Sequence, residues 1–194
     1  YDMSRNLFKI NRIIDKMDFN KEKVNAILKR INNTQEEIKS IIENQVKNNP
    51  SLIEMLLKDY QEERFPISPI KLNPNLKVIS SPEETKISRF SLNIMDKIYA
   101  KSSDNSVSDI IEAIATYKKI KLSERIPFGH GREYYNEKMN VAAEIFANFA
   151  ELYTSGNDKS LDEVFKPDFR TQLEKIYMNT INKPKNELPK QKVK

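Results

Sequence analysis

The chain has 194 residues, of which 38% are hydrophobic and 31% charged, a composition typical of one globular domain or a domain with an extension. The formal net charge is +5, and the five lysines and one glutamate of residues 183–194 account for +4 of it, leaving about +1 for the rest. The composition excludes disulfides, thiolate nucleophiles and cysteine-ligated zinc, because there is no cysteine, and no apolar run approaches the roughly 20 residues of a membrane-spanning helix.

Apolar residues recur at three- and four-residue steps along the first part of the chain, which predicts amphipathic helices. Thr34 and Glu37 have the spacing of a capping box and are expected to begin a helix, and Pro50 is expected to precede another. The interrupted heptad before Thr34 favours a helix bundle over a coiled coil. The expected helices cover residues 3–17, 24–31, 38–46 and 52–60.

A segment with four prolines, residues 65–82, divides the chain and is expected to be a linker or an extended surface loop. The stretch "LKVIS" within it could form a short strand, but the sequence offers this strand no partner. Gly156 is placed to end a helix with a left-handed cap. Further helices are expected over residues 83–100, 107–119, 137–154 and 168–182.

These patterns predict an all-α, multi-helix globular fold with a weakly bipartite layout. The expected parts are an N-terminal helical segment, the proline-rich linker, a C-terminal helical part and a basic disordered tail. Their bounds are 1–64, 65–82, 83–182 and 183–194.

The stretch "PFGHGREYY", residues 127–135, contains the only histidine of the chain, His130, between two glycines. Histidine is the side chain most easily recruited for metal or proton chemistry. A lone loop histidine is more often a surface or capping residue, however, and a zinc site normally needs at least three protein ligands. The histidine alone therefore does not indicate a metal site.

The helix expected over residues 137–154 has an apolar face and, beside it, a narrow polar stripe. One interpretation of the stripe is a solvated helix edge with helix-forming glutamates. The other is that Glu144 lies at the core boundary, partly desolvated, as a metal ligand or general base. The apolar face consists of Val141, Ala142, Ile145, Phe146, Phe149, Leu152 and Tyr153, and the stripe of Asn140, Glu144, Asn148 and Glu151.

The order "SDIIEAI", "PFGHGREYY", "AAEIFANFAELYTSGND" and a final amphipathic helix resembles the C-terminal portion of a zincin-like group, over about residues 105–182. That group includes the metallopeptidase-like domains of MuF-type phage minor head proteins and the peptidase domain of anthrax lethal factor. The most specific element is "EIFANFAEL", which begins at Glu144.

The resemblance implies a role for several residues. Glu144 matches the position of the third zinc ligand, and Tyr135 or Tyr134 loosely matches a tyrosine that assists at the oxyanion. Asn148 lies one turn after Glu144, where a residue that supports the ligand would be useful. The resemblance implies no ligand role for His130, which we expect to organise the loop through a hydrogen bond.

The chain departs from the zincin pattern at one decisive point. Zincins hold zinc through the two histidines of His-Glu-x-x-His, and a chain with one histidine cannot contain that motif. We therefore expect no cofactor in this chain alone, with zinc possible only if the motif helix is supplied from elsewhere. The start at Tyr1 favours a piece of a longer or processed protein.

Three functions remain open. The first is a phage virion protein segment, either minor head or ejected, with a structural or binding role and a degenerate or incomplete zincin-like site. The second is the C-terminal part of an active zinc metallopeptidase or toxin effector whose motif lies upstream, and the third is a helical adaptor without catalytic ancestry. The expected partners are other virion or parent-chain segments and, through Lys183 to Lys194, a polyanion such as DNA, with no membrane. The expected location is the virion or host cytoplasm, or outside the cell for an effector.

Overall fold

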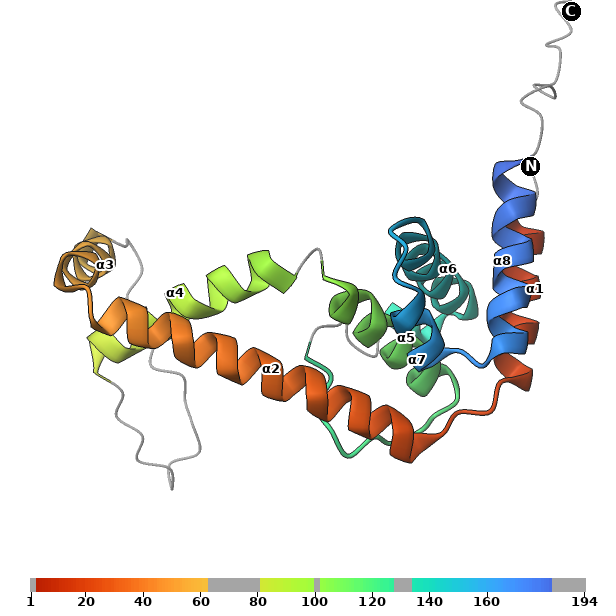
Figure 1. Ribbon diagram of the computed structural model, residues 1–194, viewed down its shortest axis with the longest axis horizontal. Coiled ribbons are helices and arrows are strands. Elements are labelled where there is room, and N and C mark those ends of the chain that lie inside the picture. The colour runs from red at the N-terminus through yellow and green to blue at the C-terminus, as the bar shows by residue number, and fades with distance from the viewer. Residues whose placement is uncertain (1–2, 63–80, 100–101, 128–133, 183–194) are drawn as a thin grey trace, which may run out of the picture. The chain divides into compact units, whose positions relative to one another are not determined.

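The computed structural model describes residues 3–62, 81–99, 102–127 and 134–182 (Figure 1). Within these ranges it contains helices and no strand, which confirms the all-α prediction. The possible strand "LKVIS" lies outside the described residues. The helices are α1 (Met3–Lys16), α2 (Lys21–Lys47), α3 (Pro50–Glu62), α4 (Pro82–Tyr99), α5 (Ser103–Tyr117), the short 3-10 helix η1 (Tyr134–Asn136), α6 (Lys138–Thr154), α7 (Asp158–Val164) and α8 (Pro167–Ile181).

The chain divides into two compact units. Unit 1 combines residues 1–30 with residues 102–194, and unit 2 consists of residues 31–101. This division differs from the expected boundaries at the proline-rich segment, because α1 packs against α6 and α8 and so joins the C-terminal helices. Most of the 65–82 segment and all of the 183–194 tail lie outside the described residues.

The two helices expected over residues 24–31 and 38–46 are one continuous helix, α2. The prediction that Thr34 and Glu37 begin a new helix is therefore wrong. Asn32, Asn33 and Thr34 have low helix propensity. Because this stretch contains no proline or glycine, it does not break a helix whose flanking turns are well formed. The expected break at Pro50 is confirmed, since α2 ends at Lys47 and α3 begins at Pro50.

The core of unit 1 forms where α5 and α1 pack on α6, with α7 against α5 and α6 and α8 against α1 and α6. Large aliphatic and aromatic side chains, which recur at three- and four-residue steps along the helices, fill this core. Gly156, with φ of +71°, ends α6 in the left-handed conformation that the sequence predicted. The fully buried side chains include Ile10, Ile14, Ile110, Ile111, Ile114, Ile145, Phe149, Leu152, Leu161 and Leu173.

Unit 2 has its own small core, in which Val46 of α2, Leu56 of α3 and Ile87 of α4 pack together. A capping box begins α4: the Glu84 backbone N–H donates to Ser81 Oγ and the Ser81 N–H donates to the Glu84 carboxylate, each at 3.1 Å. Local signals thus define the start of α4.

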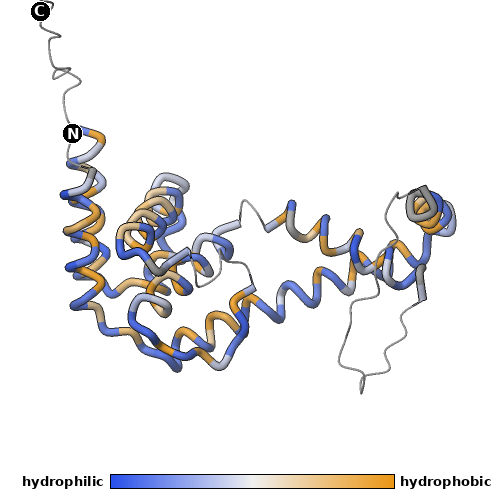
Figure 2. The backbone as a smooth tube through the Cα atoms, turned by 180° about the vertical axis from the view of Figure 1, so that it is seen from behind, coloured by the Kyte–Doolittle hydropathy of each residue, from blue (hydrophilic) through white to orange (hydrophobic). Residues whose placement is uncertain are grey.

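Hydrophobic and hydrophilic residues alternate along the helices of both units (Figure 2). Long uninterrupted apolar runs are missing from them. Among the described residues, no helix combines the length and the apolar character needed to cross a membrane.

Candidate functional site

The polar stripe of α6 lies at the edge of the unit 1 core and is not simply a solvated edge. Val141, Ile145 and Phe149 of the neighbouring face are fully buried, as predicted. This burial fixes the rotation of α6 and leaves Glu144 half-buried and Asn148 buried. A helix position beside a packed face holds its side chain in a defined direction.

Glu144 is held from two directions. The side-chain amide of Asn148 donates to Glu144 Oε1 at 2.8 Å and to the Glu144 backbone carbonyl at 3.0 Å. The Tyr134 hydroxyl donates a longer bond, 3.5 Å, to Glu144 Oε2. We call Tyr134, Tyr135, Glu144 and Asn148 the tyrosine–glutamate cluster.

The two tyrosines reach α6 because η1 packs against it. The Asn140 side-chain amide donates to the Tyr134 carbonyl at 2.9 Å, which ties η1 to the first turn of α6. The rings of Tyr134 and Tyr135 meet edge to face, with centroids 5.1 Å apart and planes at 82°. Tyr135 is buried and Tyr134 is exposed.

The hydroxyl groups of Tyr134 and Tyr135 both stay protonated at neutral pH. Partial desolvation of the Tyr134 hydroxyl raises its pKa above the usual range, and the charge of Glu144 and the hydrogen bond to it raise it further. Burial also raises the pKa of Tyr135, and the negative charges of Glu144 and two carboxylates of α5 add to the effect. The cluster thus presents hydroxyl donors beside a carboxylate.

Those α5 carboxylates are Asp109 and Glu112, both buried. Both lie in the stretch "SDIIEAI", and no role was predicted for them from its pattern. The sequence could have indicated a role, because two acids three residues apart in an apolar helix share one face. Carboxylates buried on such a face need hydrogen-bond or ionic partners there. A hydrogen bond also joins α5 to α6: the Ser106 hydroxyl donates to the Glu151 carboxylate at 3.1 Å.

A hydroxyl donor beside a pre-oriented carboxylate can bind a polar group or supply one carboxylate ligand to a metal. As a ligand, Glu144 would be oriented by Asn148, which donates to one oxygen of its carboxylate, in the way that the zincin resemblance implies. The described residues do not make up a complete zinc site by themselves. The chain has one histidine and no cysteine, and in the part that the structure describes no group of three His, Cys, Asp or Glu side chains is placed to hold a metal.

Of the residues predicted from sequence, the structure brings together Glu144, Tyr134 and Asn148, with Tyr135 packed against Tyr134. His130 belongs to residues 128–133, which lie outside the described residues, so its expected hydrogen bond stays a prediction.

Comparisons with known proteins find no match for this chain among protein-family profiles, curated proteins or solved structures.

Proposed function

We propose that unit 1 is a binding module of a phage virion protein, with the tyrosine–glutamate cluster as an incomplete zincin-like site. The observation that carries this proposal is the placement of Glu144, whose carboxylate accepts from Asn148 on one oxygen and from Tyr134 on the other. The zincin resemblance assigns these positions to the ligand, the assisting tyrosine and a supporting residue. The proposal rests on that correspondence and on the single histidine of the chain.

In this proposal the cluster has a binding and structural role. Tyr134 and Tyr135 supply hydroxyl groups that remain protonated through neutral pH, and Glu144 supplies a fixed negative charge. Zinc, if a partner segment supplied the two histidines, would contribute a Lewis acid beside Glu144. The chain's own residues would orient that carboxylate and donate hydrogen bonds to an oxygen nearby.

A second candidate, the C-terminal part of an active zinc metallopeptidase or toxin effector, draws on the same placement of Glu144. The two candidates differ in whether a histidine motif exists in the parent protein. A plain helical adaptor is less well supported, because its carboxylate at position 144 would be expected to face open solvent, and Glu144 is half-buried and hydrogen-bonded.

Mass spectrometry of purified phage particles from the source strain tests the virion assignment. We expect tryptic peptides of α6 and α8 in particles purified by density gradient, at a constant ratio to the capsid protein. Peptides that occur only in the culture medium and not in particles would contradict the proposal and favour a secreted effector. A matched sample treated to eject the DNA separates a shell component from an ejected one.

A further inference from the structure

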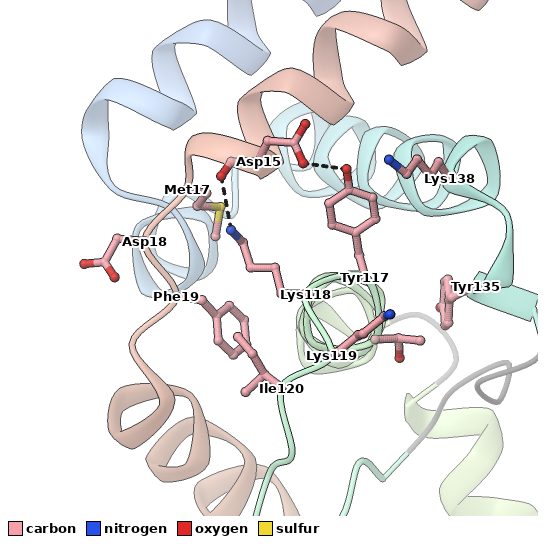
Figure 3. A pocket seen from close by; sticks show the side chains of 11 residues that line it. Asp15, Met17, Asp18, Phe19, Tyr117, Lys118, Lys119, Ile120, Tyr135 and Lys138 are labelled. Carbon is pink, nitrogen blue, oxygen red and sulfur yellow. Dashed lines mark hydrogen bonds between the residues drawn. The ribbon is translucent and has the colours of Figure 1, made fainter.

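Unit 1 contains a pocket of about 820 Å³. Of the four residues of the tyrosine–glutamate cluster, Tyr135 alone lines this pocket. It lies where the C-terminal ends of α1 and α5 meet the first turn of α6 (Figure 3). Its walls carry Lys118 and Lys119 from the end of α5 and Lys138 from α6. Pockets with convergent polar groups and apolar walls are the usual form of small-ligand sites.

The charges of this pocket favour an anion. Two aspartates also line it, but Asp18 is paired with Lys166 at 2.9 Å, and this bond and charge lower the Asp18 pKa. Asp15 accepts a 2.6 Å hydrogen bond from Tyr117. The pocket therefore has three lysines in its walls and one aspartate, Asp15, whose carboxylate is not paired with a lysine.

Two helix C-termini, which are partially negative, oppose an anion here. One carbonyl at each end already has a partner: Lys118 Nζ lies 3.5 Å from the Asp15 carbonyl of α1, and the Ala115 carbonyl of α5 accepts the Ile120 N–H at 2.8 Å. A lysine carries a full positive charge and a helix end about half a negative one, so the lysines dominate the field.

Lys119 is held in an unusual backbone conformation beside the pocket. Its φ is +55°, the left-handed region that glycine usually occupies after a helix. Strain of this kind at a non-glycine residue often marks a functional position. In the part of the chain that the structure describes, Lys119 and Lys138 make no ion pair, and Lys138 Nζ lies 5.7 Å from the Tyr117 ring centre.

Aromatic and apolar side chains also line the pocket: Tyr117 at the end of α5, Phe19 in the connection between α1 and α2, and Ile120 beside Phe19 (Figure 3). We infer that this pocket binds a small organic anion, a phosphate or carboxylate group carried on an apolar body about the size of one ring. Lys119 and Lys138 bind the anionic group, and Phe19 with the Tyr117 ring contacts the apolar body. This inference is independent of the zincin-like site.

Isothermal titration with phenyl phosphate, benzoate and inorganic phosphate tests the inference. We expect phenyl phosphate or benzoate to bind more tightly than inorganic phosphate, and the better of the two shows which anion the pocket takes. Lys119→Gly and Lys138→Gln should each weaken binding about fivefold, the effect of one charge near the surface. Lys175→Gln, an exposed lysine of α8, is the matched control and should change nothing.

Lys119→Gly also separates ligand loss from misfolding, because glycine suits the backbone at this position and the variant should melt no lower than wild type. Two results would overturn the inference. One is no binding of phenyl phosphate or benzoate at millimolar concentration. The other is equal weakening by Lys175→Gln, which would indicate nonspecific attraction to lysines. With the first result, binding of a single-stranded oligonucleotide would identify a nucleic acid as the occupant instead.

Discussion

The side-chain amide of Asn148 donates a 2.8 Å hydrogen bond to the carboxylate of Glu144, one helical turn before it, and Asn148 is buried. Asn148→Ala removes this donor and leaves the half-buried carboxylate less well satisfied. We expect the free energy of unfolding to fall by about 1–2 kcal/mol. Urea unfolding followed by circular dichroism measures this change.

The matched control for this substitution is Asn179→Ala, at an exposed position of α8. Because it removes no buried partner, we expect a change within about 0.5 kcal/mol. Equal losses in the two variants would mean that Asn148 contributes no more than any surface asparagine, and the proposed support of Glu144 would then fail.

The Tyr117 hydroxyl links α5 to Asp15 of α1, and burial, together with this hydrogen bond, raises its pKa to about 12. An unfolded tyrosine ionises near pH 10, so the unfolded state loses its proton first. The stabilisation from Tyr117 is therefore fully present below pH 10 and is lost as the pH rises through 12. Tyr117→Phe should flatten the decline in stability across this window.

Chemical unfolding at a series of pH values from 9 upward, with tyrosinate absorbance recorded in parallel, checks that expectation. Asp15→Asn removes one cause of the shift and should move the Tyr117 titration toward its ordinary range. An unchanged slope in Tyr117→Phe would show that other groups govern alkaline unfolding.

Two helix ends in unit 1 place residues in the left-handed region, and they offer a reciprocal experiment. Lys119 has φ of +55° after α5, and Gly156 has φ of +71° after α6. A side chain costs about 1 kcal/mol in this conformation. We expect Lys119→Gly to raise the free energy of unfolding by about that amount and Gly156→Ala to lower it similarly.

Apart from Gly156 and its two chain neighbours, no heavy atom lies within 4 Å of the position that a Cβ on Gly156 would occupy, so its substitution tests backbone conformation without a steric clash. Thermal melts of the two variants and the wild type give the comparison. If both substitutions destabilise, or both stabilise, backbone strain does not explain the conformation of Lys119.

Much of the helical fold follows from local pattern. The buried face of α6 was predictable because Val141, Ile145 and Phe149 recur at helical steps, and the cap at Gly156 because glycine tolerates positive φ. The continuity of α2 was not, because low-propensity residues do not by themselves say whether a helix stops. No helix was predicted over residues 158–164, where α7 lies, since seven residues carry little periodic signal.

The candidate site shows the same limit. Glu144 and Asn148 were found together because they lie one turn apart on one helix. The partnership of Asp15 with Tyr117 joins residues 102 positions apart, and no local spacing encodes it. The assignment of α1 to unit 1 depends on the same long-range packing, so neither it nor the lysine-lined pocket could be obtained from helix patterns alone.

Zinc analysis of the purified chain, after equilibration with one equivalent of zinc and dialysis against a weak chelator, tests whether the site around Glu144 is incomplete. If Glu144 is one ligand of an incomplete site, wild type and Glu144→Ala should both retain far less than one zinc per chain. One tightly held zinc per wild-type chain, lost in Glu144→Ala and kept in the exposed-residue control Glu54→Ala, would contradict the account and indicate a complete metal site.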